Sequence, residues 1–386
     1  MTGTSLGVAV IGYGWMGRLH AQAYSRLRHH YPDLPAARLI AVADPETDRQ
    51  ADAIQRFGFE RSVADWRELL DDPAVEALSV TAPNHWHRQI ATAAAAAGRH
   101  VWVEKPVGLT AADALAVASA IKSAGVQSCV GFNYRSAPAV QHARDLIADG
   151  SLGTVTHARF RLFSDYAGHP RGALSWRFER AQGGTGVLGD LASHGVDLVR
   201  FLLGEVDEVI ADTAIFIAQR PRPEGVGSHY AIAKGGQAGE VENEDYLCSM
   251  LRTSAGARVV LEASRVAVGD QNNYGLEIHA TKGLLRWDFR RMGELEVSTG
   301  DSYASQPVTT VFAGPGHGDY AAFQPGAAIA MSYDDLKVIE AAGFVASVAD
   351  GKPHGATAED AAASAQVLEA MTQSARTGRW TPVQAQ

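Results

Sequence analysis

The sequence contains very little cysteine. Cys129 and Cys248 are the two cysteines in a chain of 386 residues, and they do not form a Cys-x-x-Cys motif. Small secreted domains that depend on disulfides carry many more cysteines, so a disulfide framework is excluded. This cysteine content indicates a protein of a reducing compartment, in which both thiols serve as small apolar core residues.

Long apolar runs and dense basic runs are also missing. The most apolar helical stretch, Ile90–Ala97, is too short to span a bilayer. Lys and Arg number 34 against 43 Asp and Glu, which gives a net charge of −9. Because a phosphate backbone attracts clustered positive charge, we expect no nucleic-acid partner and no membrane partner. The first residues lack the pattern of an export signal, so we expect a cytoplasmic protein.

The composition is that of a folded globular protein. Apolar residues make up 46% of the chain and charged residues 20%, which is too apolar for a disordered chain. At about 150 residues per domain, the length predicts two or three domains.

The first third of the sequence alternates short apolar runs with helical patterns. Leu6–Gly12 is a nearly continuous apolar run that ends in glycine, as is typical of a buried parallel strand. Further strands are predicted at Arg38–Ala43, Ala77–Ala82, Val101–Glu104 and Gln127–Phe132. Helices are predicted at Trp15–Arg28, Glu46–Phe57, Asn84–Ala97 and Thr110–Ala124. Because strands that alternate with helices form parallel sheets, residues 1–133 are predicted to be a Rossmann domain.

A different pattern extends over residues 134–386. A helix at Ala137–Asp149, a strand at Thr154–Phe163 and a helix at about Thr185–Leu203 come first. Strand candidates then follow with few helices between them: Glu208–Ile217, Asp245–Arg252, Ala257–Val266, Tyr274–Ala280, Gly283–Phe289 and Glu294–Ser298. Helices at Tyr333–Ala349 and Ala358–Thr377 close the chain. We predict an α/β protein whose second domain is an α+β domain with an open, largely antiparallel sheet.

The segment between the first strand and the first helix has the pattern Gly-x-Gly-x-x-Gly. The first glycine permits a tight turn, the second lets a pyrophosphate approach the backbone, and the third lets helix and strand pack closely. The helix N-terminus adds a positive field. A glycine-rich turn without a ligand is the alternative. The predicted cofactor-binding residues of this segment are Gly12, Gly14, Trp15, Met16 and Gly17.

Asp44 ends the second predicted strand, where a carboxylate that binds the adenosine ribose is expected. This charge accepts hydrogen bonds from both ribose hydroxyls and repels a 2′-phosphate. Pro45 follows, where proteins that bind NADP more often carry arginine or a small polar residue. We therefore expect NAD as the cofactor, and Arg49 keeps NADP as the second choice.

Several further motifs carry a resemblance to a known family. They are Thr81-Ala82-Pro83-Asn84 with His87, Val103-Glu104-Lys105-Pro106, Asp190-x-x-x-His194 and the closing segment Ala375–Trp380. Together with the glycine pattern, they make the chain resemble the Gfo/Idh/MocA oxidoreductase family from end to end. Within it, Gly131–Arg135, Leu174–Phe178 and Gln271–Tyr274 are most similar to the levoglucosan dehydrogenase and inositol dehydrogenase branches.

The resemblance implies that Lys105, Asp190 and His194 are catalytic and act where the two domains meet the nicotinamide. An ammonium group at Lys105 suits this role because it stabilises an alkoxide as charge develops on the reacting oxygen. The alternative is a surface lysine that pairs with Glu104. Pro106 makes the preceding bond a candidate cis peptide, which the resemblance also suggests.

Asp190 and His194 are four residues apart, so they are predicted to share one face of a helix. His194 is the predicted proton acceptor, because an imidazole titrates close to neutral pH. Asp190 is its predicted partner and a ligand of a substrate hydroxyl. The alternative is an Asp–His pair that stabilises the helix at a domain boundary.

The remaining predicted site residues follow from the same resemblance. The further residues predicted to contact the cofactor are Pro83, Asn84, His87, Glu104 and Lys105. The residues predicted to contact a sugar-like substrate are Lys105, Asp190 and His194 and, in addition, Tyr134, Trp176, Arg177 and Asn273. Each of the last four also has a packing or ion-pair explanation. We expect no metal, because the His85–His87 segment and the acidic residues near His194 lack the ligand density of a metal site.

The predicted function is NAD-dependent oxidation of a secondary hydroxyl of a sugar, anhydrosugar or cyclic polyol to the ketone. Two alternatives stay open: a glycosidase that recycles NAD by oxidation and elimination at C3, and a regulator that senses NAD without catalysis. Apolar residues point to both sides of the strand Glu208–Ile217, so we expect a homodimer or homotetramer that assembles through the second sheet.

Overall fold

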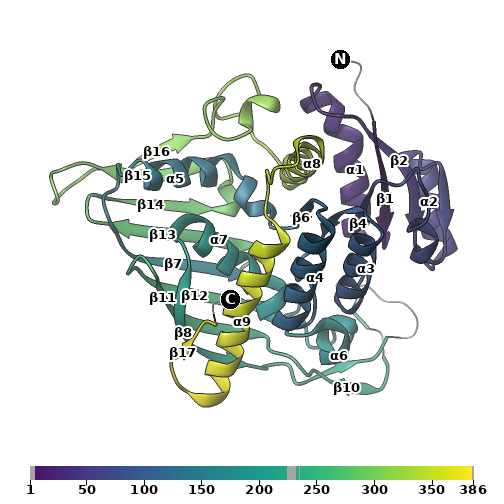
Figure 1. Cartoon of the computed structure of the whole chain (residues 1–386). Helices are drawn as coiled ribbons and strands as arrows, with labels where there is room; N and C mark the ends of the chain where they lie inside the picture. The colour runs from purple at the N-terminus through teal and green to yellow at the C-terminus, as the bar shows by residue number, and fades with distance from the viewer. Residues whose placement is uncertain (1–4, 224–231, 234, 385–386) are drawn as a thin grey trace. The chain divides into compact units, whose positions relative to one another are not determined.

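The structure is a computed structural model that describes residues 5–223, 232–233 and 235–384 (Figure 1). The chain divides into two compact units. Unit 1 comprises Met1–Ser136 and Met331–Ala362, and unit 2 comprises Ala137–Ala330 and Ala363–Gln386. The functional division at residue 133 stays a prediction. Helix α8, Tyr333–Asp350, belongs to unit 1, where it packs against helix α1 and strand β6.

Unit 1 is built on a six-stranded parallel sheet in the order β3-β2-β1-β4-β5-β6. The strands are β1 Leu6–Ile11, β2 Ala37–Ala43, β3 Arg61–Val63, β4 Ala77–Val80, β5 His100–Val103 and β6 Ser128–Val130. The helices beside α8 are α1 Trp15–His30, α2 Thr47–Phe57, α3 Asn84–Ala96 and α4 Ala111–Ala124. All six residues of β1 are buried, as its continuous apolar run predicts. The Rossmann prediction is confirmed.

Local sequence sets the helix ends in unit 1. The Thr110 side chain accepts a hydrogen bond from the backbone N–H of Asp113, and the Asp113 side chain reaches back to the N-cap backbone, which forms a capping box at the start of α4. Gly125, in the left-handed region at φ 67°, ends the same helix. Gly58 ends α2 in the same way at φ 73°.

Unit 2 contains a nine-stranded sheet in the order β16-β15-β14-β13-β7-β12-β11-β8-β17. Its strands are β7 Val155–Phe163, β8 Val206–Ala214, β11 Tyr246–Thr253, β12 Arg258–Ser264, β13 Asn273–Ala280, β14 Gly283–Asp288, β15 Glu294–Thr299, β16 Thr309–Phe312 and β17 Thr381–Pro382. Its helices are α5 Pro138–Ala148, α6 Arg180–Gly183, α7 Ser193–Leu203 and most of α9 Ala358–Thr377. A small hairpin pairs β9 Gln219–Pro221 with β10 Ala238–Glu240.

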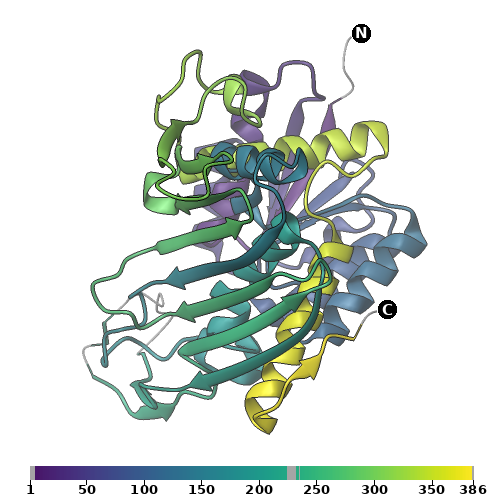
Figure 2. The same cartoon turned by 90° about the vertical axis from the view of Figure 1, so that its left-hand side faces the viewer.

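The large sheet of unit 2 has one face covered by helices. Every neighbouring pair of strands is antiparallel except β7 with β12, so the prediction of a largely antiparallel sheet is confirmed. Helices α5, α7 and α9 lie on one side, and Figure 2 shows the opposite face turned toward the viewer. Alternate residues of β7 reflect this arrangement: Ala158, Phe160 and Leu162 are buried, whereas His157 and Arg159 are exposed.

Among the predicted elements of unit 2, two depart most from the structure. Strand β8 ends at Ala214, so the predicted extension to Ile217 is wrong. The reason is that the Asp245 carboxylate accepts hydrogen bonds from the backbone N–H groups of Phe216 and Ile217, at 2.9 Å and 3.0 Å, which removes them from the ladder. The outward apolar residues predicted at the end of this strand therefore lie beyond it.

The predicted helix at about Thr185–Leu203 is helical from Val187 onward, but its first part is not a regular α-helix. Leu188–Ala192 is a single π-helical turn, and the α-helix α7 begins at Ser193. Upstream, Glu244 takes the first backbone donors: its carbonyl oxygen accepts from Val187 N–H at 2.9 Å, and its carboxylate accepts from Leu188 N–H at 3.2 Å. These two external acceptors satisfy N–H groups at the start of the helix, which have no partner within it.

No helix in the described ranges combines the length and the apolar character needed to cross a membrane.

Candidate active site

The glycine loop of unit 1 has the geometry that a dinucleotide requires. Gly12 has φ +87°, and a Cβ there would lie 2.7 Å from the backbone of Ala82. A Cβ on Gly17 would lie 2.1 Å from the carbonyl oxygen of Gly12, so only glycine permits this close packing of helix and strand. A Cβ on Gly14, by contrast, would meet no heavy atom within 4 Å. The open space at Gly14, at the N-terminus of α1, fits the approach of a pyrophosphate.

Asp44 lies directly after β2 and is buried. Its carboxylate accepts hydrogen bonds from the backbone N–H of Tyr13 at 2.7 Å and of Glu46 at 3.0 Å. Nη1 of Arg49 lies 3.5 Å from Oδ2 of Asp44. The contact with Tyr13 holds the carboxylate beside the glycine loop. A carboxylate has further lone pairs, which can accept hydrogen bonds from ribose hydroxyls.

The two residues that follow Gly14 begin α1. Trp15 is 63% exposed, and its ring stacks on that of Tyr333 from α8 at 5.8 Å between centroids. Met16 is half-buried. Tyr333 also lies edge-on to Tyr134, at 6.4 Å, so Trp15 and the predicted substrate residue Tyr134 belong to one aromatic group within unit 1.

The segment after β4 is fixed by a buried histidine. Pro83 and Asn84 lie at the start of α3, and His87 follows on its first turn. The two ring nitrogens of His87 each lie 2.7 Å from a carbonyl oxygen, Nδ1 from that of Pro106 and Nε2 from that of Ala82. Burial lowers the pKa of His87, and the two carbonyls oppose this shift. His87 therefore links the end of β4 to the segment that follows β5.

Glu104 and Lys105 follow β5 and differ in their surroundings. The Lys105–Pro106 peptide bond is cis, as predicted, and Lys105 is half-buried. Glu104 is buried, and its Oε1 lies 2.6 Å from Nζ of Lys337 and 3.0 Å from Nε2 of His20. The predicted contact of Glu104 with the cofactor stays a prediction; the structure places its carboxylate in a buried ionic cluster.

No motif in the sequence indicates this cluster, whose centre is Lys337 on α8. Lys337 is 0% exposed and also donates to the carboxylate of Glu340 at 2.6 Å. Although burial alone raises the pKa of Glu104, the Lys337 ammonium holds that pKa well below its usual range. Burial lowers the pKa of His20 to about 4.

In unit 2, Asp190 lies within the π-helical turn that precedes α7. Turns of this type are rare and occur frequently at functional sites. Oδ2 of Asp190 accepts a hydrogen bond from the Tyr166 hydroxyl at 2.5 Å, and Oδ1 accepts one from Nη1 of Arg177 at 3.3 Å. The guanidinium of Arg177 lies over the ring of Trp176 at 4.7 Å. The structure therefore brings together three predicted site residues and adds Tyr166, which no motif indicated.

His194 lies on the first turn of α7 and is buried. Its neighbour Gly195 lets the helix lie close to the sheet, since a Cβ there would be 2.6 Å from Leu162 and 2.8 Å from Leu261. The position of His194 is thereby fixed against strands β7 and β12. The interpretation that Asp190 orients His194 stays a prediction.

Asn273, predicted to bind substrate, begins β13 within a charged network. Its amide oxygen accepts from Arg161 at 2.8 Å and from Arg290 at 3.0 Å, and its amide nitrogen donates to Asp270 at 2.8 Å. A sugar hydroxyl would have to compete with these partners. Across residues 5–223, 232–233 and 235–384, we find no group of three His, Cys, Asp or Glu side chains that could hold a metal ion.

Comparison with known proteins gives consistent results over both parts of the chain. Residues 6–132 match an oxidoreductase family with an NAD-binding Rossmann fold, and residues 140–286 match the GFO/IDH/MocA C-terminal domain. The levoglucosan dehydrogenase of Pseudarthrobacter phenanthrenivorans is 35% identical over 98% of each chain. The inositol 2-dehydrogenase of Rhizobium meliloti is 28% identical over 84% of this chain and 91% of its own.

Solved structures agree with these sequence matches. A levoglucosan dehydrogenase in complex with NADH and levoglucosan has a TM-score of 0.93 and 33% sequence identity, over 99% of this chain and 100% of its own. An NAD-binding oxidoreductase from Klebsiella pneumoniae has a TM-score of 0.92 and 34% identity, with the same coverage of both chains.

Proposed function

Because the chain belongs to the Gfo/Idh/MocA family of NAD-binding oxidoreductases, we propose that it oxidises a secondary hydroxyl of a sugar, anhydrosugar or cyclic polyol to a ketone. The observation that carries this proposal is the 35% identity to a levoglucosan dehydrogenase over 98% of both chains. Two further observations support it: the open glycine loop in unit 1, and the hydrogen bonds of Asp190 with Tyr166 and Arg177 in unit 2.

The proposed reaction removes two hydrogens from one CH–OH group. The C–H hydrogen leaves the carbon as a hydride with the bonding electron pair, and NAD held by the glycine loop and Asp44 would supply the hydride acceptor. The hydroxyl proton passes to His194, and the O–H electron pair forms the ketone π bond. Lys105 donates a hydrogen bond to the reacting oxygen and stabilises negative charge on it. Asp190 accepts a hydrogen bond from a substrate hydroxyl and fixes the orientation of the ring.

A substrate panel tests this proposal. We expect NADH to form with at least one member of a set of polyols, aldoses, anhydrosugars and glycosides. We expect NAD to be preferred to NADP because the Asp44 carboxylate repels a 2′-phosphate. Since each turnover releases a proton, oxidation is expected to be faster at alkaline pH and reduction to be favoured toward neutral pH. Consumption of a glycoside without accumulation of NADH, or no reaction with any compound, would contradict the proposed oxidation.

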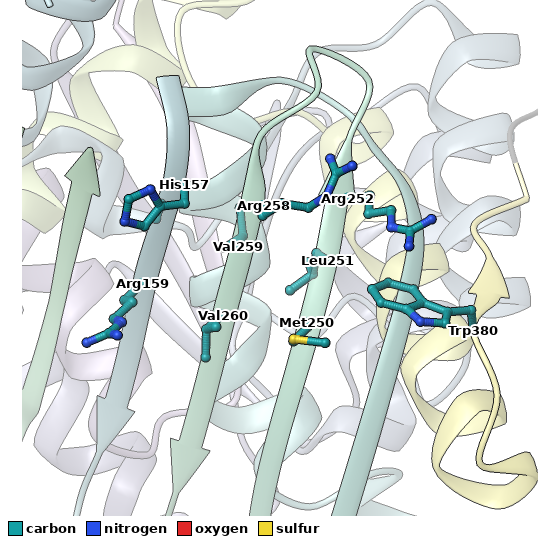
Figure 3. A pocket seen from close by; sticks show the side chains of 10 residues that line it. His157, Arg159, Met250, Leu251, Arg252, Arg258, Val259, Val260 and Trp380 are labelled. Carbon is teal, nitrogen blue, oxygen red and sulfur yellow. The ribbon is translucent and has the colours of Figure 1, made fainter. Parts of the chain in front are cut away.

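We also propose that the helix-free face of the large sheet joins two or more copies of this chain. Ile210, Met250 and Val260 lie side by side on β8, β11 and β12, and Met250 is 49% exposed. Met250 and Val260 line a hollow of about 320 Å³. Figure 3 shows their side chains together with those of Arg252 and Trp380, which line the same hollow. An apolar row bordered by arginines is typical of the centre and rim of an interface.

Sedimentation tests this assembly. At micromolar concentration we expect a dimer or tetramer, and Met250→Glu is expected to shift it to monomers because it places charge at the centre of the apolar row. Val268→Glu is the matched control, since Val268 is 79% exposed and lies outside the strands. A monomeric wild-type protein would reject the proposal.

A further inference from the structure

Tyr166 is a site residue that neither the motifs nor the proposed roles include. It lies in the turn after β7, where the backbone N–H of Ala167 donates to the carbonyl oxygen of Arg265 at 3.0 Å. From there its hydroxyl reaches the π-helical turn and donates to Oδ2 of Asp190 at 2.5 Å. A phenol that donates to a carboxylate forms a hydrogen bond about twice as strong as one between neutral groups.

The turn that carries Tyr166 is held by two buried arginines. Arg220 is 1% exposed and donates to the carbonyl oxygens of Ala167 at 2.5 Å and His169 at 3.1 Å. The guanidinium groups of Arg220 and Arg265 both lie over the ring of Phe178. The centroid of that ring is 4.3 Å from Cζ of Arg220 and 4.6 Å from Cζ of Arg265. Because Arg265 is in turn paired with Asp245 at 2.8 Å, the turn is anchored to the sheet.

The apolar surroundings of Tyr166 add to this rigidity. Its ring packs against a buried cluster that contains Ala167, Leu174, Phe178 and Val241. Burial and the nearby charge of Asp190 raise the pKa of Tyr166 well above its usual value. The phenol therefore stays protonated at neutral pH, where it acts as a hydrogen-bond donor to Asp190.

The two oxygens of Asp190 thus each have a donor from this unit, Tyr166 at Oδ2 and Arg177 at Oδ1. Both groups donate to the carboxylate and fix the plane in which its two oxygens lie. We propose that Tyr166 is a positioning residue of the reaction, which holds the Asp190 carboxylate in the orientation in which it accepts a hydrogen bond from a substrate hydroxyl. This inference rests on the proposed function, which gives Asp190 its contact with substrate.

A double-mutant cycle tests the role of Tyr166. Tyr166→Phe removes one hydroxyl and is expected to lower kcat/KM for the best substrate of the panel about tenfold or more, because a hydrogen bond to a charged group is lost. The KM for NAD is expected to change less than about twofold. In the Asp190→Asn background, adding Tyr166→Phe is expected to have almost no further effect, since the carboxylate on which Tyr166 acts is gone.

Tyr246→Phe is the matched control. Its hydroxyl also donates to a carboxylate of unit 2, Oε1 of Glu262, at 2.8 Å. We expect Tyr246→Phe to leave kcat/KM within about twofold of that of its parent protein, whether the parent is the wild type or Asp190→Asn. Two results would overturn the role of Tyr166 and leave the proposed function standing. One is equal activity of Tyr166→Phe and wild type. The other is a loss of activity that multiplies with that of Asp190→Asn and parallels a fall in Tm. A wild-type protein that oxidises nothing in the panel would instead overturn the proposed function.

Discussion

Replacement of Lys105 by alanine is expected to lower kcat by about two to three orders of magnitude, the usual effect of removing one donor to a developing oxyanion. The affinity for NAD is expected to change less than about threefold, because the glycine loop and Asp44 lie on other parts of unit 1. Lys105 follows β5 at the carboxyl end of a parallel strand, where open α/β sheets bind their ligands.

The measurement is steady-state turnover with the best substrate of the panel, together with NADH binding followed by fluorescence. Lys122→Ala is the matched control, since Lys122 is an exposed lysine on α4 of the same unit. We expect wild-type turnover from this control. If Lys105→Ala kept wild-type turnover, the role of Lys105 in the proposed reaction would be wrong.

The amino-terminal sheet could be predicted from the sequence because its signals are local. The apolar run of β1, the three glycines and the capping residue Thr110 each act over a few neighbouring residues. Short strands gave weaker signals. β3 and β9 have three residues each, and β17 has two, so none is long enough to show a periodicity.

The membership of α8 in unit 1 was beyond the reach of local patterns. This helix contacts α1 and β6, from which about 200 residues or more of chain separate it. The Lys337–Glu104 ion pair spans 233 positions in the sequence. A single lysine in a helical pattern is usually solvated, and only the fold shows that this lysine is buried.

The candidate site shows the same division between local and distant signals. Gly12, Lys105 and Asp190 belong to motifs whose residue types and spacing carry their chemistry. Tyr166 acts through a contact with a residue 24 positions away, across an irregular turn. Asp190 lies in a π-helical turn, which the i, i+4 spacing of Asp190 and His194 does not reveal.

Lys337→Met is expected to have the largest effect on stability of any single substitution considered for this chain. It removes the ammonium that lies 2.6 Å from the carboxylates of both Glu104 and Glu340. Burial alone lowers the pKa of Lys337, but the two carboxylates hold it above the usual value of lysine, so the wild-type cluster contains a permanent cation. Removal of one partner leaves buried charge uncompensated, and we expect the free energy of unfolding to fall by about 3–5 kcal/mol.

Urea unfolding of wild type and variants measures this effect. Lys282→Met is the matched control, because the pair of Lys282 with Asp301, at 3.3 Å, is largely exposed; we expect a change below about 1 kcal/mol. The double variant Lys337→Met/Glu104→Gln is expected to lose less than the sum of the two single losses, since it removes a buried negative charge together with its partner. Strict additivity would show that Lys337 and Glu104 do not stabilise each other. A loss for Lys337→Met no larger than that for Lys282→Met would show that the cluster does not stabilise unit 1.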